Sequence, residues 1–176
     1  MFAFAPARVH HGGVRILGID PGLNVTGYGL IEVAGDRAVH VRHGVIRTRP
    51  AEARPARLLA LREGVLAVAR ESGAAAAAIE SGFVGQNVRS ALLLGEARAA
   101  AILALADAGL EVAEYAPAMV KQTVAGFGRG EKEQVARMVA FQLGLPKPPS
   151  PEDAADALAV AITHWAHGRL AGLPRR

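Results

Sequence analysis

The stretch VRILGIDPG at residues 14–22 decides the fold, because it predicts how the chain begins its core. Residues 16–19 form a short apolar run, which is typical of a buried strand. Asp20 follows directly, and Pro21-Gly22 suits the two central positions of a type II turn. The sequence therefore predicts a buried strand over Val14–Asp20 that presents a carboxylate at its carboxyl end.

The chain after this turn is predicted to form two strands and then alternating helices and strands. Thr26–Val33 and Ala38–Thr48 are the two strands, joined by a hairpin connection at residues 34–36. The further predicted elements are, in order, helix Pro55–Ser72, strand Ala74–Glu80, helix Val88–Ala108, strand Leu110–Tyr115, and helices Pro117–Ala125, Gly130–Leu143 and Pro151–Gly168. Because strand–helix–strand units need crossovers, the later strands should pair in parallel. The predicted class is α/β: a mixed five-stranded sheet, three antiparallel strands and then parallel strands, flanked by helices.

Length and composition predict one globular domain. The chain has 176 residues, of which 51% are hydrophobic and 20% charged, so it can bury a core. We expect the domain to span residues 14–170, with residues 1–13 as an extension outside the fold and residues 171–176 as a tail. The lack of cysteine excludes disulfide scaffolds, cysteine zinc sites and thiol catalysis. No apolar stretch reaches the ~18 residues of a membrane span, and none resembles a secretory signal, so we expect a cytoplasmic protein without a membrane partner.

Arginine dominates the positive charge of the chain. The formal net charge is +4, yet residues 37–62 contain seven arginines against one acid, Glu52. Two interpretations of this arginine window remain open. It is either a surface that follows DNA phosphates or a solvated strand edge and helix face.

Four carboxylates fall where the predicted fold would bring them together. Asp20 and Glu80 each end a strand, and adjacent strands would place them side by side. Asp153 and Asp156 lie three residues apart at the start of the last helix, so they share a face. Carboxylate oxygens suit Mg²⁺ or Mn²⁺, and a bound cation would offset their mutual repulsion. Each acid also has a purely structural interpretation. Asp20 could belong to a turn and Glu80 to a solvated strand end. Asp153 and Asp156 could favour the start of a helix that has Ser150 as N-cap and Pro151 at its first position.

The motifs around these acids, in their order and spacing, resemble the RuvC family of bacterial Holliday junction resolvases, the crossover junction endodeoxyribonucleases. They are Gly18-Ile19-Asp20-Pro21-Gly22, Ala78-Ile79-Glu80, Val120–Val124 and Asp153–Leu158. The likeness runs from about Val14 to His164. It implies a ribonuclease H-like fold and a homodimer that binds four-way junction DNA and nicks two opposed strands. It also implies joint work with a branch-migration motor complex of the RuvA and RuvB type.

The resemblance further implies a metal-dependent nuclease site. By position, the family's catalytic and metal-binding acids fall on Asp20, Glu80, Asp153 and Asp156. Two Mg²⁺ ions would be held in each active site, and Mn²⁺ would substitute for them. The implied reaction is hydrolysis of a phosphodiester bond that leaves a 5′ phosphate and a 3′ hydroxyl.

Four further residues are predicted to bind DNA. Lys121 and Lys132 match basic positions of the family near the active site, and Lys121 is also predicted to take part in catalysis. Phe83 matches an aromatic residue that meets bases near the opened crossover. Arg89, at the start of the predicted helix Val88–Ala108, is assigned to DNA binding as well.

Two other functions are compatible with parts of the sequence. A noncatalytic DNA-binding module could use the arginine window. An actin-like or sugar-kinase phosphate-binding domain also begins with an Asp-x-Gly turn after its first strand, as at Asp20-Pro21-Gly22. Such proteins clamp a nucleotide between two domains, however, and no second turn of this kind follows a later strand.

Overall fold

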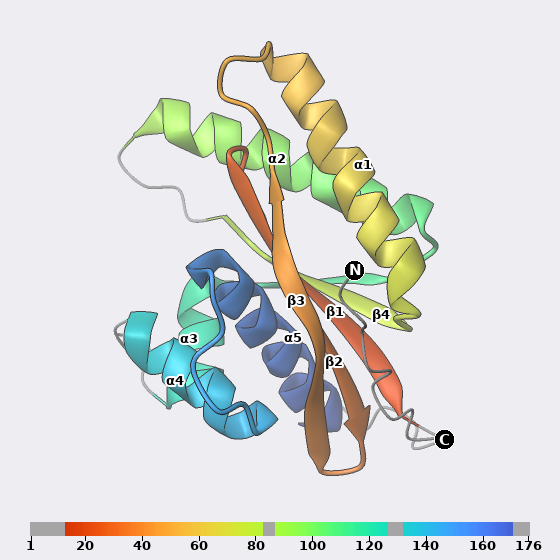
Figure 1. Ribbon diagram of the computed structural model, residues 1–176, viewed down its shortest axis with the longest axis vertical. Helices are drawn as coiled ribbons and strands as arrows, with labels where there is room; N and C mark the ends of the chain where they lie inside the picture. The colour runs from red at the N-terminus through yellow and green to blue at the C-terminus, as the bar shows by residue number, and fades with distance from the viewer. Residues whose placement is uncertain (1–12, 83–86, 127–131, 171–176) are drawn as a thin grey trace, which may run out of the picture.

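A five-stranded sheet runs through the protein, and helices cover both of its faces (Figure 1). The computed structural model describes residues 13–82, 87–126 and 132–170. The strands are β1 (Val14–Asp20), β2 (Val25–Ala34), β3 (Arg37–Arg47), β4 (Ala76–Glu80) and β5 (Val112–Tyr115). The helices are α1 (Arg54–Ser72), α2 (Val88–Asp107), α3 (Pro117–Ala125), α4 (Lys132–Leu143) and α5 (Glu152–Leu170).

The strand order β3-β2-β1-β4-β5 confirms the predicted mixed sheet. β1 pairs antiparallel with β2, and β2 with β3, whereas β1–β4 and β4–β5 are parallel. The alanine-rich segment before Glu80 is a strand, as predicted, although alanine favours helices. It is a strand because Ala77, Ala78 and Ile79 are fully buried inside the sheet.

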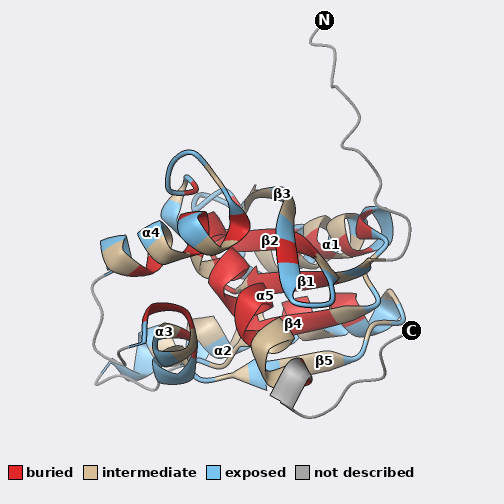
Figure 2. Cartoon of the chain, turned by 90° about the horizontal axis from the view of Figure 1, so that it is seen from below, coloured by how far each residue is buried: buried red, intermediate tan, exposed pale blue. Residues whose placement is uncertain are grey.

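The alternation of side chains along β1 divides the core into two layers. Leu17 and Ile19 face α1 and α2 and join their apolar cluster, while Ile16 faces the layer of α3, α4 and α5. Figure 2 shows α5 as a largely buried helix against the sheet. Asp20 follows Ile16 by four residues in the same strand, so its side chain lies on the same face and projects toward α5.

Three glycines of β1 and β2, here called the glycine seat, let α5 lie directly on the sheet. A Cβ atom on Gly18 would lie 2.1 Å from the Ala157 carbonyl oxygen, and one on Gly27 would lie 1.8 Å from that of Asp153. A Cβ atom on Gly29 would lie 2.7 Å from the backbone nitrogen of Leu158. Backbone therefore packs on backbone, a close approach that a side chain at these positions would prevent.

The start of α5 corrects one detail of the sequence prediction. The backbone N–H groups of Ala154 and Ala155 donate to the carbonyl oxygen of Pro151, at 3.0 and 3.3 Å. Pro151 therefore occupies the N-cap position and the helix begins at Glu152. The prediction that Ser150 caps the helix and Pro151 opens it is wrong by one residue.

The ends of the predicted domain lie outside the described residues. Positions 1–12 and 171–176 are not described, so the extension and the tail remain predictions. Across the three described ranges, no helix combines the length and the apolar character that crossing a membrane requires.

Candidate active site

Asp20 and Glu80 end two neighbouring parallel strands at the centre of the sheet. The register pairs Ile19 of β1 with Ile79 of β4, so the next residue of each strand is an acid. Both acids lie on the face of the sheet that α5 covers. Side chains two residues apart in a strand point to the same face, and Gly18 and Ala78, two residues before Asp20 and Glu80, face α5. The structure thus places the two strand-end carboxylates side by side, as predicted.

The glycine seat brings the acids of α5 to the same place. Asp20 is paired with Gly27 in the β1–β2 ladder, and Gly27 is the residue against which the Asp153 carbonyl packs. Asp156 follows one turn later and is half-buried, within a run of α5 that is otherwise buried. The first turn of α5 therefore lies over the end of β1 that carries Asp20.

The electrostatics of the four acids show how closely they interact. The pKa of Asp20 is raised from 3.8 to about 8, first by burial and then by the charges of Glu80, Asp156 and Asp153. The pKa of Glu80 is raised from 4.5 to about 7 by burial and by Asp156. Burial also raises the pKa of Asp156, to which the charge of Asp153 adds. Asp20, Glu80 and Asp156 therefore repel one another when they are charged, and a bound cation would offset this repulsion.

Two lysines predicted from the sequence lie next to these acids. Lys132, the first residue of α4, places its Nζ 3.7 Å from Asp156 Oδ2 and 3.8 Å from Glu152 Oε2. The charge of Asp156 is the main cause of a raised Lys132 pKa. Lys121 of α3 lowers the pKa of Glu80 through its positive charge. Glu152 was not among the candidate residues, since no local pattern in the sequence indicates that it pairs with Lys132, 20 residues before it.

The donor set fits a hard divalent cation. Among residues 13–82, 87–126 and 132–170, no three His, Asp or Glu side chains stand close enough together to hold a metal ion as they are. The four acids nevertheless supply only oxygen donors, and the charges of their neighbours help to raise the pKa of Asp20, Glu80 and Asp156. A cation that drew the carboxylates together would remove this repulsion, and Mg²⁺ and Mn²⁺ prefer such oxygen ligands.

The other two predicted DNA-binding residues are not part of this cluster. Phe83 lies outside the described residues. Arg89 is exposed near the start of α2 and lines a separate cavity of about 350 Å³. The remaining residues that line this cavity are Leu23, Glu52, Arg54, Arg57, Leu92 and Leu93.

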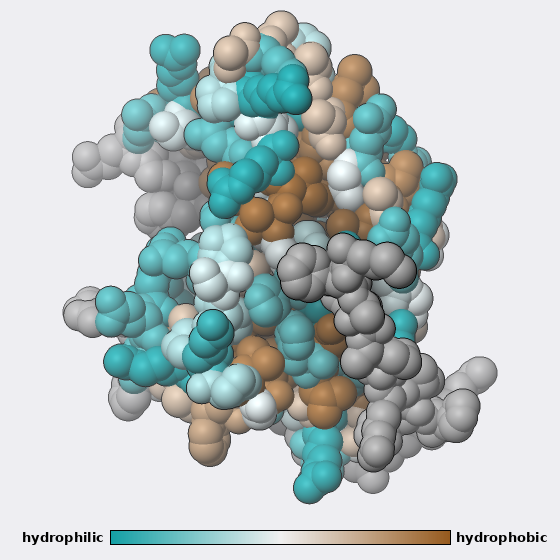
Figure 3. All heavy atoms as spheres, in the orientation of Figure 1, coloured by the Kyte–Doolittle hydropathy of each residue, from teal (hydrophilic) through white to brown (hydrophobic). Residues whose placement is uncertain are grey.

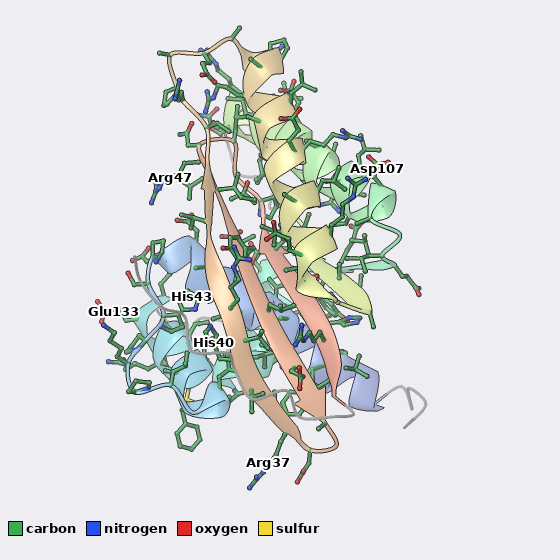
Figure 4. All side chains as sticks on the ribbon, turned by 45° about the vertical axis from the view of Figure 1, so that its right-hand side comes forward. Arg37, His40, His43, Arg47, Asp107 and Glu133 are labelled. Carbon is green, nitrogen blue, oxygen red and sulfur yellow. The ribbon has the colours of Figure 1, made fainter. Side chains whose placement is uncertain are left out.

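The arginine window is mostly engaged in contacts within the protein. Ion pairs join Arg42 to Glu71, Arg49 to Glu52, Arg54 to Glu96 and Arg62 to Asp107. Arg57 donates from Nε to Thr48 Oγ1 at 3.0 Å and from Nη2 to the Leu23 carbonyl at 3.2 Å. Figure 4 shows Arg37 and Arg47 pointing away from the sheet. These contacts favour the structural interpretation for most of the window.

The metal-free protein is expected to lose stability as the pH rises from about 4 to about 8. The pKa values of Asp20 and Glu80, about 8 and about 7, exceed their ordinary values, so the folded state retains protons that the unfolded chain releases. This stabilisation is complete below about pH 4 and is lost as the pH rises through 7 and 8. Melting in EDTA across this range should show a falling Tm, and Mg²⁺ should reverse the fall. A flat Tm in EDTA would contradict the electrostatic description.

Known proteins resemble this chain over most of its length. Residues 16–164 match the family model described as Crossover junction endodeoxyribonuclease RuvC. The protein of that name from Afipia carboxidovorans is 46% identical over 163 residues, 93% of this chain and 95% of the relative. That from Burkholderia thailandensis is 52% identical over 155 residues, 88% of this chain and 84% of the relative. Thermus thermophilus RuvC, solved in complex with Holliday junction substrate, superposes with a TM-score of 0.84 at 36% identity, covering 90% of this chain and 96% of that structure.

Proposed function

Because the chain belongs to the RuvC family of crossover junction endodeoxyribonucleases, we propose that it resolves Holliday junctions by cutting two opposed DNA strands. The observation that carries this proposal is the meeting of Asp20 and Glu80 with Asp153 and Asp156 at one end of the sheet. A noncatalytic DNA-binding module would have no use for four acids gathered at one end of the sheet. Membership of the family also replaces the actin-like and sugar-kinase interpretation.

Nucleases of this family depend on a metal ion. In this chain we assign two Mg²⁺ ions, replaceable by Mn²⁺, to Asp20, Glu80, Asp153 and Asp156. When bound, such ions activate water for attack on the phosphorus and stabilise the leaving 3′ oxygen, which yields 5′ phosphate and 3′ hydroxyl ends. The protein contributes a half-buried cradle of carboxylates whose repulsion in the metal-free state favours cation binding.

The two lysines next to the acids are proposed to hold the scissile phosphate. Lys121 and Lys132 approach the cluster from α3 and α4, so their charges flank it. A cation in such a position offsets negative charge that develops on the phosphate oxygens. Phe83 and Arg89 are proposed to contact DNA beyond the scissile phosphate, Phe83 by stacking on an unpaired base.

A homodimer is proposed because paired nicking needs two active sites, and α2 offers a surface for it. Val88, Leu92 and Leu103 share one face of α2 and are 69%, 65% and 58% exposed. Figure 3 shows apolar side chains exposed among hydrophilic ones in the region of α1 and α2. Large apolar side chains aligned on one helix face are typical of an interaction surface. The occupant proposed here is the same helix of a second copy.

We further propose that the protein acts in the cytoplasm, on chromosomal DNA, together with a branch-migration motor complex of the RuvA and RuvB type. The support for this proposal is family membership, since residues 16–164 match the family model. No described residue is assigned to that contact.

The test is cleavage of a labelled four-way junction in Mg²⁺, with EDTA and a linear duplex of the same sequence as controls. We expect nicks in two opposed strands of the junction, none in EDTA and little cutting of the duplex. Binding measured in Ca²⁺ separates affinity from hydrolysis. Salt-sensitive binding without cleavage would indicate the noncatalytic module, equal cutting of the duplex a general nuclease, and single unpaired nicks would contradict the dimer.

A further inference from the structure

A polar cluster joins β5, α3 and α5 beside the candidate active site. The Tyr115 hydroxyl lies 3.0 Å from Nδ1 of His164, and the ring of His167 lies 5.4 Å from the Tyr115 ring. Thr123 Oγ1 lies 3.4 Å from His167 Nε2. Tyr115 and Thr123 come from β5 and α3, whereas both histidines come from α5, so three elements meet at one tyrosine.

The backbone of Tyr115 is fixed to the strand end that carries Glu80. Tyr115 is the ladder partner of Glu80 between β4 and β5, and its carbonyl oxygen accepts the N–H of Ser81 at 2.8 Å. The Tyr115 ring also packs against the cluster of buried residues beneath α5. A shift of Tyr115 would therefore move the backbone at Glu80 and directly after it.

The chain passes directly from Tyr115 into α3. α3 starts two residues after Tyr115, at Pro117, and carries Lys121, whose charge acts on Glu80. His164 lies on the helix that carries Asp156, two turns beyond it. The Tyr115–His164 contact thus ties β5, the strand that leads into the helix carrying Lys121, to the helix that carries Asp156, and Thr123–His167 ties α3 itself to α5.

From this geometry we propose that Tyr115 is a positioning residue, which through His164 holds Glu80 and Lys121 at fixed distances from Asp156. The inference rests on the proposed nuclease function. Neither Tyr115 nor His164 reaches the reacting phosphate in this role. Small displacements of groups that act together on one atom are costly, since a misplacement of about 1 Å can lower a rate about 100-fold.

Tyr115→Phe tests the proposal, because it removes only the hydroxyl and keeps the ring. We expect single-turnover cleavage of the four-way junction at saturating Mg²⁺ to fall about tenfold, while junction affinity in Ca²⁺ stays within about twofold. The matched control is Tyr28→Phe, since Tyr28 is the other tyrosine of the chain and lies in the layer of α1 and α2. That control should cleave at the wild-type rate.

Variants of His164 test the partner. His164→Leu should lower the cleavage rate as Tyr115→Phe does, and the double variant should be no slower than either single one. His164→Asn should recover most of the rate, because its amide can bond to the tyrosine hydroxyl from the place of Nδ1. Wild-type cleavage by Tyr115→Phe, or a rate loss matched by an equal loss of affinity, would overturn the proposal.

Amide hydrogen exchange gives a readout that does not need cleavage. Tyr115→Phe should speed exchange at Ser81 and along α3, and Tyr28→Phe should not, because Tyr115 bonds to Ser81 and leads into α3 whereas Tyr28 lies in the other layer. Unchanged exchange in Tyr115→Phe would overturn the positioning role even if the protein cut no junction. A wild-type protein that fails to cut the four-way junction in Mg²⁺ would instead contradict the proposed function.

Discussion

Replacement of Asp20 by Asn is expected to abolish junction cleavage while leaving junction binding intact. Asp20 lies at the end of the central strand, and its carboxylate interacts with each of the other three acids, Glu80, Asp156 and Asp153. Loss of that charge should cost about 4 kcal/mol or more of transition-state stabilisation, hence about a thousandfold or more in rate. The measurement is single-turnover cleavage of a labelled junction in Mg²⁺, beside binding in Ca²⁺.

The stability of the same variant provides an independent check. Because the Asp20 carboxylate is buried and repelled by its neighbours, a neutral amide should leave the metal-free protein at least as stable at about pH 8. Asp107→Asn is the matched control. Asp107 is the last residue of α2 and pairs with Arg62 rather than with any acid of the cluster (Figure 4). Near-normal cleavage by Asp20→Asn at saturating Mg²⁺ would refute the assignment of the metal site.

Gly27→Ala is expected to destabilise the protein and to remove most of its activity with one methyl group. The new Cβ would lie 1.8 Å from the Asp153 carbonyl oxygen, so α5 must move away from the sheet. Overpacking against rigid backbone costs about 3 kcal/mol. A helix displaced by about 1 Å would also carry Asp153 and Asp156 away from Asp20, with a loss of about 100-fold in cleavage rate.

The control for this substitution is Gly95→Ala in α2. A Cβ atom on Gly95 meets nothing within 4 Å, so the same methyl group should leave Tm unchanged or raise it slightly. Thermal melting of the two variants, and single-turnover cleavage of Gly27→Ala beside the wild type, give the comparison, because Gly95 lies on the face of α2 proposed for the dimer. If Gly27→Ala melted and cleaved like the wild type, α5 would not be seated on the glycines as described.

The order of elements could be predicted because its signals are local. A short apolar run closed by Asp20-Pro21-Gly22 predicts a strand end, and a segment between two glycines that is too short for a helix predicts β4. The strand-end and helix-start positions of the acids follow from the same local patterns. The parallel pairing of β1 with β4, together with the packing of α5 on the sheet, is then enough to bring the four acids together.

What the sequence did not predict depends on contacts between distant residues. Gly27 and Gly29 let a helix from the far end of the chain approach the sheet, and no local pattern identifies that helix. Glycine inside a strand pattern is itself a signal of such an approach, and it could have been used. The partners of Arg42 and Arg62 lie 29 and 45 residues away, and no local pattern distinguishes such ion pairs from a DNA surface.

The glycine seat also determines when the nuclease can exist during protein synthesis. The seat belongs to β1 and β2, which leave the ribosome early, but its occupant, α5, is translated after every other described element. Until residues 152–170 emerge and dock, Asp20 and Glu80 have no carboxylates above them. A nascent chain therefore carries only half of the proposed metal site, and on this proposal the ability to cut DNA arises only when α5 docks on the sheet.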